Sequence, residues 1–139
     1  MRGLVDTNVI LDALTSREPW NRSAEKIFLM CANHLAELYI TASSVTDLYY
    51  LIRKYIKSTE NAKQIMNKLL SLFCILDVTS EDCIEALASP ITDYEDAVLE
   101  RVASKNRMDC IVTRNIKDYQ NASVRVLSPD EFIHLMEKE

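Results

Sequence analysis

Aspartates mark several points in this sequence where extended runs give way to helical patterns. Asp93 and Asp96 lie three residues apart at the head of a helical pattern, so their carboxylates share one side of its first turn. Single acids follow apolar or β-prone runs at Asp6, Asp47 and Asp118. Carboxylates brought close together repel unless a proton or a cation intervenes, and hard oxygen ligands suit magnesium or manganese. If these segments converge, they favour a divalent metal site.

Each aspartate also has a structural explanation. Asp6 can cap the helix that follows it, and Asp47 can complete a capping box with Ser44. Asp93 and Asp96 can form another cap. Together the acids are harder to explain in this way, because most of them lie where an extended segment ends.

Strand-like and helical patterns alternate along the chain. Helices are expected to begin near residues 7, 21–23, 43–44, 58–61, 80, 93 and 128. Short strands are expected at residues 3–5, 38–41, 72–78, 110–113 and 124–127. This alternation predicts an α/β fold, a three-layer α/β/α sandwich with a short parallel sheet covered on both faces. Functional groups then gather beyond the carboxyl ends of the strands, where remote acids can meet.

Length and composition favour one globular domain spanning residues 1–139. The chain has 139 residues, of which 48% are hydrophobic, which is enough for a sizeable core. A single glycine excludes the glycine-rich dinucleotide and P-loop fingerprints, which need several. No segment resembles a signal peptide or a membrane span, so the protein is expected to be cytoplasmic. The four cysteines lack a Cys-x-x-Cys pair and are expected to be small core residues.

The net charge of −5 argues against a broad nucleic-acid-binding surface. Bound divalent cations would reverse the charge locally, so an attractive site can exist on an acidic protein. Tyr94 and Tyr119 are candidates for stacking on bases, although packing is the default for both. The candidate phosphate contacts are Arg17, Arg53, Lys54, Arg114 and Lys117.

Four segments together resemble the signature regions of PIN-domain nucleases, in the same order and with similar spacing across almost the whole chain. They are Asp6-Thr7-Asn8-Val9-Ile10-Leu11-Asp12, the acid Asp47, Asp93-Tyr94-Glu95-Asp96-Ala97, and Ile111-Val112-Thr113-Arg114-Asn115 with Asp118-Tyr119. Arg17-Glu18-Pro19-Trp20 and Leu48-Tyr49-Tyr50 are similar to a bacterial branch of that superfamily. Within it, the chain most resembles VapC-like toxins of type II toxin–antitoxin pairs.

The resemblance implies a metal-dependent endoribonuclease. Asp6, Asp47, Asp96 and a residue of the Thr-Arg-Asn segment would surround one or two magnesium or manganese ions, which activate water for attack on a phosphodiester. The full implied ligand set is Asp6, Asp47, Asp93, Asp96, Asn115 and Asp118, with Asp6, Asp47, Asp96 and Asp118 as catalytic residues. Two positions depart from the family pattern: Asp47 stands where glutamate is frequent, and Asn115 stands where aspartate is frequent. Asp118 is a candidate substitute for the missing acid.

The resemblance also implies an RNA substrate, a homodimer and a small antitoxin partner. The alternative is a catalytically silent PIN-fold module that binds RNA or protein. A receiver-type signalling domain fits less well, because Asp6 has no adjacent acid and no lysine follows the last expected strand. A haloacid dehalogenase-type phosphatase would need Asp-x-Asp after the first strand, where position 8 is Asn8.

Overall fold

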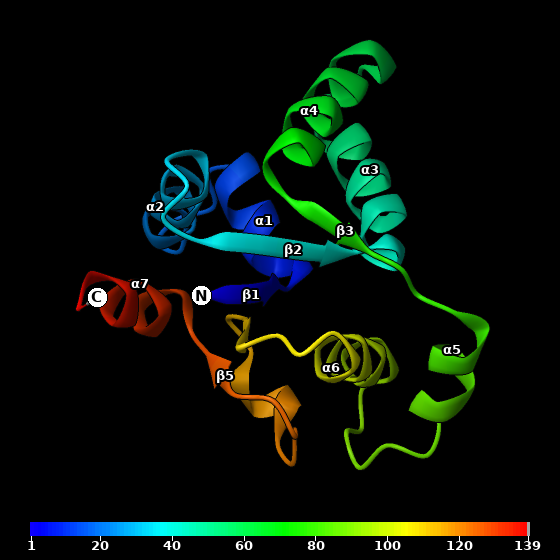
Figure 1. Cartoon of the computed structure of the whole chain (residues 1–139). Coiled ribbons are helices and arrows are strands. Elements are labelled where there is room, and N and C mark those ends of the chain that lie inside the picture. Colours follow the sequence, from blue (N-terminus) through cyan, green and yellow to red (C-terminus); the bar gives the residue numbers. More distant parts are fainter. Residues whose placement is uncertain (139) are drawn as a thin grey trace.

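A five-stranded parallel sheet forms the centre of the protein, whose structure is a computed structural model describing residues 1–138. The strands are ordered β3-β2-β1-β4-β5, and Figure 1 shows them fanning across the middle of the molecule. Their bounds are β1 Arg2–Val5, β2 Glu37–Thr41, β3 Cys74–Leu76, β4 Cys110–Val112 and β5 Val126–Leu127. In register, Leu4 of β1 lies opposite Tyr39 of β2 and Ile111 of β4. The predicted parallel α/β fold is therefore confirmed.

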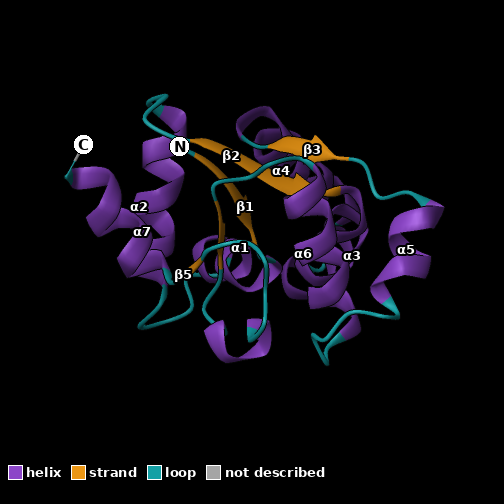
Figure 2. Ribbon diagram, turned by 60° about the horizontal axis from the view of Figure 1, so that its bottom comes forward, coloured by secondary structure: helices purple, strands orange, loops and turns teal. Residues whose placement is uncertain are grey.

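Seven α-helices and one 3-10 helix connect and cover the strands in the described residues. They are α1 Thr7–Leu14, α2 Asn21–Ala32, α3 Ala42–Ile56, α4 Thr59–Leu72, α5 Ser80–Ala86, α6 Tyr94–Lys105, the 3-10 helix η1 Ile116–Tyr119 and α7 Pro129–Glu137. In Figure 1, α1 to α4 lie on one side of the sheet and α5 and α6 on the other. Figure 2 shows α5 at the periphery beside α6. No helix in residues 1–138 is both long and apolar enough to cross a membrane.

Two separate cores form because successive strand residues point to opposite faces. In β1, Val5 packs with α1, α2, α3, α4 and α7, whereas Leu4 packs with α6 and the segments around it. The same alternation occurs in β4, where Val112 joins the first core and Ile111 the second. Burial on both faces explains why the central strands β1 and β4 are almost uninterruptedly apolar. It also gives the expected three layers.

Side-chain caps begin most helices at or next to the expected residues. The hydroxyls of Ser58 and Ser128 accept hydrogen bonds from backbone N–H groups in the first turns of α4 and α7. The proposed cap by Asp47 is wrong: Thr41 caps α3, and its hydroxyl accepts from the Ser44 N–H. The helix α2 begins at the expected place, but Trp20 occupies its N-cap position and provides no capping side chain.

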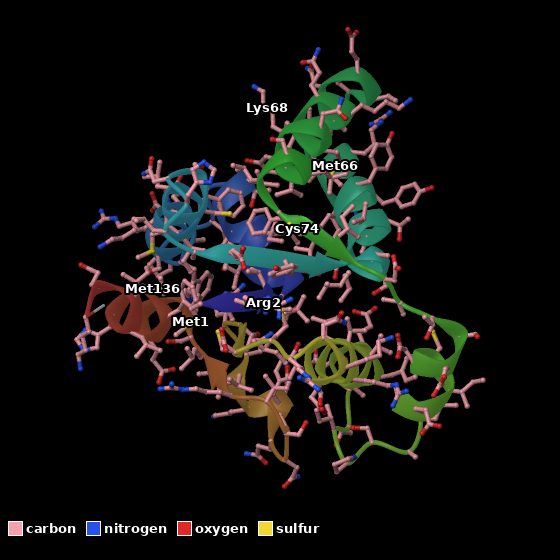
Figure 3. All side chains as sticks on the ribbon, viewed as in Figure 1. Met1, Arg2, Met66, Lys68, Cys74 and Met136 are labelled. Carbon is pink, nitrogen blue, oxygen red and sulfur yellow. The ribbon has the colours of Figure 1, made fainter. Side chains whose placement is uncertain are left out.

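The cysteines divide into two classes. Cys31 and Cys110 are buried, as expected, whereas Cys74 and Cys83 are exposed. Cys74 begins the edge strand β3, which has only one neighbouring strand and an exposed start (Figure 3). The expectation of four core cysteines is thus wrong for two of them, because a short edge strand and a peripheral helix leave apolar sequences partly uncovered.

Candidate active site

The connectivity of the sheet places a site at the carboxyl ends of β1 and β4. The chain runs from β1 outward through β2 and β3, then returns to the other side of β1 with β4 and β5. Between β1 and β4 the connections leave in opposite directions, which opens a crevice beyond the strand ends. Asp6 directly follows β1 and Thr113 directly follows β4. These two residues meet in that crevice.

Hydrogen bonds to both its backbone and its carboxylate hold Asp6 in place. Its backbone N–H donates to the Val112 carbonyl at 2.9 Å, which continues the pairing of β1 with β4. Its Oδ1 accepts from the Thr7 N–H at 2.7 Å as the cap of α1, as expected. Its Oδ2 accepts from the buried Thr113 hydroxyl at 2.9 Å. The Thr-Arg-Asn segment therefore acts on the first acid through its threonine.

Asp96 approaches Asp6 from the first turn of α6. Asp93 caps that helix, because its Oδ1 accepts from the Asp96 N–H at 3.0 Å. The Tyr119 hydroxyl lies 3.0 Å from Oδ2 of Asp6 and 3.0 Å from Oδ1 of Asp96. The two carboxylate oxygens are therefore at most about 6 Å apart, within the range where charges shift each other's pKa. The structure brings together two of the four expected catalytic acids directly.

Close packing of these acids changes their protonation. The pKa of Asp96 is raised to about 7, first by burial and then by the charge of Asp6, while the hydrogen bond from Tyr119 lowers it in part. Burial also raises the pKa of Asp6. Two full charges 6 Å apart would repel by about 3 kcal/mol at an effective dielectric constant of about 20. A single hydroxyl proton serves one carboxylate at a time, so the contact with both oxygens fits a site that holds one additional proton.

Asp47 and Glu95 line the same pocket as Asp6 and Asp96. This pocket has a volume of about 350 Å³ and includes the exposed ring of Tyr50. Burial and then the charge of Asp47 raise the pKa of Glu95. Sequence analysis did not single out Glu95, although its place beside Asp96 in the motif was the available signal. Four acidic side chains, one directly after β1, one from α3 and two from α6, thus line one pocket.

Asp93 and Asp118 lie at the border of this group. Both line a neighbouring pocket of about 490 Å³ together with Lys117, and the charges of both add to the rise in the pKa of Asp96. Asn115 precedes η1, is exposed, and its side chain makes no hydrogen bond within residues 1–138. Asp93 and Asp118 therefore influence the site through their charges, but none of the three residues lines the pocket shared by Asp6 and Asp96.

Two candidate phosphate contacts have another partner. Arg114 donates two hydrogen bonds to the buried carboxylate of Asp12, at 2.8 and 3.3 Å, and its guanidinium lies 4.0 Å from the centre of the Trp20 ring. Arg17 lies 3.7 Å from the same carboxylate. Arg17 and Arg114 thus neutralise Asp12, which is 1% exposed, and their role as phosphate contacts stays a prediction. Asp12 belongs to the first signature segment, but its place inside a helix gave no sign of partners remote in sequence.

The two tyrosines that were candidates for base stacking have different surroundings. Tyr119 is 3% exposed, so its ring cannot meet a base. The Tyr94 hydroxyl donates to the Cys83 carbonyl at 2.7 Å, which ties the start of α6 to α5. Packing thus accounts for the ring of Tyr119, whereas the ring of Tyr94 is 44% exposed and its role in base stacking stays a prediction. Two other candidate phosphate contacts lie elsewhere. Lys117 lines the pocket that also contains Asp93 and Asp118. Arg53 donates a hydrogen bond to the Thr59 hydroxyl near the start of α4.

The donor set fits magnesium or manganese. Within residues 1–138 no three histidine, cysteine or acidic side chains are gathered tightly enough to form a complete metal cage. Magnesium does not need one, because it retains several waters and is bound by one or two carboxylates together with substrate phosphates. Asp6 and Asp96 provide such a pair of hard oxygen donors. The elevated pKa of Asp96 also indicates a place where an added positive charge would be favourable.

Comparison with known families agrees with this geometry. A family model described as PIN domain matches residues 2–117. The chain belongs to the PIN domain family. That match includes Asp6, Asp47, Asp96 and the Thr-Arg-Asn segment, and ends before Asp118. No match is found among curated proteins.

The fold is similar to that of chains in several solved structures, including toxin–antitoxin complexes. It is similar to a chain of a toxin–antitoxin complex from Klebsiella pneumoniae, with 22% identity, a TM-score of 0.68, and coverage of 91% of this chain and 97% of that one. A chain of VapBC2 from Rickettsia felis, bound to a promoter DNA fragment, has 19% identity and a TM-score of 0.65 over 92% and 98%. PAE2754 from Pyrobaculum aerophilum has 14% identity and a TM-score of 0.70 over 100% and 91%. At these identities the likeness concerns the fold.

Proposed function

We propose that this PIN domain is a magnesium- or manganese-dependent endoribonuclease and the toxin of a type II toxin–antitoxin pair. The observation that carries the proposal is the convergence of Asp6 and Asp96 on the Tyr119 hydroxyl at the switch point of a PIN-type sheet. Asp47 and Glu95 add negative charge to the same pocket. An acidic crevice of this kind attracts a polyanionic substrate when cations are bound in it.

The residues of the chain have distinct roles in this proposal. Asp6 and Asp96 hold the metal. Asp47 and Glu95 line the same pocket and orient the water molecules that the metal retains. Asp93, Asn115 and Asp118 remain candidate outer ligands or water-holding groups. When bound, the metal supplies an activated water and stabilises charge at the scissile phosphodiester. Thr113 keeps Asp6 in a fixed orientation, so that the binding geometry is ready before metal arrives.

Substrate contacts surround the acidic pocket. Lys117 stands next to Asp93 and Asp118, where it is placed to meet a phosphate beyond the metal-binding pair. The exposed ring of Tyr50 lies inside the acidic pocket and offers a surface on which an RNA base can stack. A single strand crossing the crevice would meet both kinds of group.

RNA cleavage by matched variants tests the nuclease proposal. Asp96→Asn removes a ligand and should abolish cleavage in manganese, whereas Asp77→Asn, an exposed acid in the loop after β3, should cleave like wild type. EDTA should stop wild-type cleavage. Cleavage that persists in EDTA, or an Asp96→Asn variant as active as wild type, would refute the metal mechanism. If manganese binds the protein but no RNA is cut, the silent binding module is the correct function.

The partner proposal is tested separately. The similar chains from Klebsiella pneumoniae and Rickettsia felis come from toxin–antitoxin complexes, which supports a small antitoxin partner here. Co-expression with a neighbouring small gene should give a complex that co-purifies and inhibits cleavage. A homodimer, placed in the cytoplasm, is the proposed state of the chain alone. Light scattering that gives the mass of one 15.9 kDa chain at micromolar concentration would contradict the dimer.

A further inference from the structure

Tyr119 is placed to act on the two acids at the centre of the site without reaching solvent itself. It ends η1, and its ring is packed in the core between the sheet and α6, with 3% exposure. Its hydroxyl is the one part of the side chain that meets polar groups, at 3.0 Å from both Asp6 and Asp96. A phenylalanine would fill the same core volume, so packing alone does not account for the hydroxyl.

The two carboxylates depend on this hydroxyl to different extents. Asp6 has independent donors in the Thr7 N–H and the Thr113 hydroxyl. Among residues 1–138, the Asp96 carboxylate has Tyr119 as its one hydrogen-bond partner, because the cap of α6 uses only the Asp96 backbone N–H. Asp96 also faces the repulsion of a neighbouring acid. Without the hydroxyl, nothing polar in the described chain would hold its carboxylate toward Asp6.

We propose that Tyr119 is a positioning residue that sets the distance and orientation between Asp6 and Asp96 for metal binding. Its ring is anchored by the core, and its hydroxyl links the first acid of the chain to the acid on α6. The segment after β4 then contributes to the site through Thr113 and Tyr119, each of which donates to a carboxylate. This inference rests on the proposed function only for the identity of the ligand as a metal ion. The positioning of the two carboxylates by Tyr119 is independent of that identity.

Tyr119→Phe removes the hydroxyl and keeps the ring. Manganese titration by calorimetry on the purified protein should show a dissociation constant weakened by roughly 10- to 100-fold, as is usual when a residue that orients metal ligands is lost. Raising the manganese concentration should restore part of the RNA cleavage, since the ligands themselves remain. Tyr39→Phe is the matched control, because its hydroxyl contacts Arg2 and Glu37 at a distance from the site. It should bind manganese like wild type.

Crystal structures in EDTA provide a test that does not depend on metal. In Tyr119→Phe the Asp96 carboxylate should rotate away from Asp6, whereas in Tyr39→Phe it should keep the wild-type orientation. An unchanged Asp96 carboxylate in Tyr119→Phe, or manganese affinity within about threefold of wild type, would overturn the positioning role. If wild type binds no manganese, the proposed function fails, and the EDTA structures alone decide whether Tyr119 positions the two acids.

Discussion

Asp96→Asn should make the metal-free protein more stable at alkaline pH, although it removes a residue of the site. In the folded protein the pKa of Asp96 is raised to about 7, first by burial and then by Asp6. An unfolded aspartate titrates near 3.9, so the folded state retains a proton that the unfolded state has released. The stability that this proton contributes is complete below about pH 4 and is lost as the pH rises through about 7. Asparagine mimics the protonated form at every pH.

The magnitude follows from the size of the shift. A displacement of about three pH units corresponds to about 4 kcal/mol for a fully buried group. Asp96 is only partly buried, and solvent screening reduces the expected effect to about 2 kcal/mol. For a chain of this length that is a rise of about 7 °C in melting temperature for the variant at pH 8 in EDTA. Near pH 4 the two proteins should melt at almost the same temperature.

Thermal melting of wild type, Asp96→Asn and Asp77→Asn at pH 4 and pH 8 measures the effect. Asp77 is exposed and lines neither of the two pockets that contain the candidate acids, so its variant should follow wild type at both pH values. Manganese should raise the melting temperature of wild type at pH 8 and have little effect on Asp96→Asn, because binding to the folded state stabilises it. A difference between wild type and Asp96→Asn that is the same at pH 4 and pH 8 would refute the reasoning about the crowded carboxylates.

Three further outcomes are expected. Asp12→Asn leaves Arg114 without a carboxylate partner and should lower the free energy of unfolding by about 3 kcal/mol, measured by urea denaturation; a loss under about 0.5 kcal/mol would contradict the pairing. Thr113→Val removes the hydroxyl that donates to Asp6. It should lower the free energy of unfolding by about 1 to 2 kcal/mol and weaken manganese binding. Unchanged manganese binding would show that other groups set the orientation of Asp6. A thiol reagent should modify the two exposed cysteines of the native protein quickly and the two buried ones only on unfolding, and four equal rates would contradict the burial pattern.

Local sequence patterns determined most of the fold. The strands of the sheet are short apolar runs, and the helices begin at residues whose side chains satisfy free N–H groups, as Ser58 and Ser128 do. Both signals depend on near neighbours in the chain, so they are legible without a structure. The prediction was wrong where two local signals compete. Ser44 and Asp47 match the pattern of a capping box, but α3 begins at Ala42 and the Thr41 side chain caps it.

Only the tertiary structure decided which charges meet. The sequence marked Asp6 and Asp96 as candidates from their places after a strand and at a helix start, but their meeting at Tyr119 depends on β4 lying beside β1 and on the angle at which α6 crosses the sheet. The pairing of Arg114 with Asp12 is likewise a contact between residues remote in sequence that the local pattern did not reveal. Strand order, helix packing and the pairing of charges remote in sequence are set by long-range contacts, whose partners no local pattern can specify.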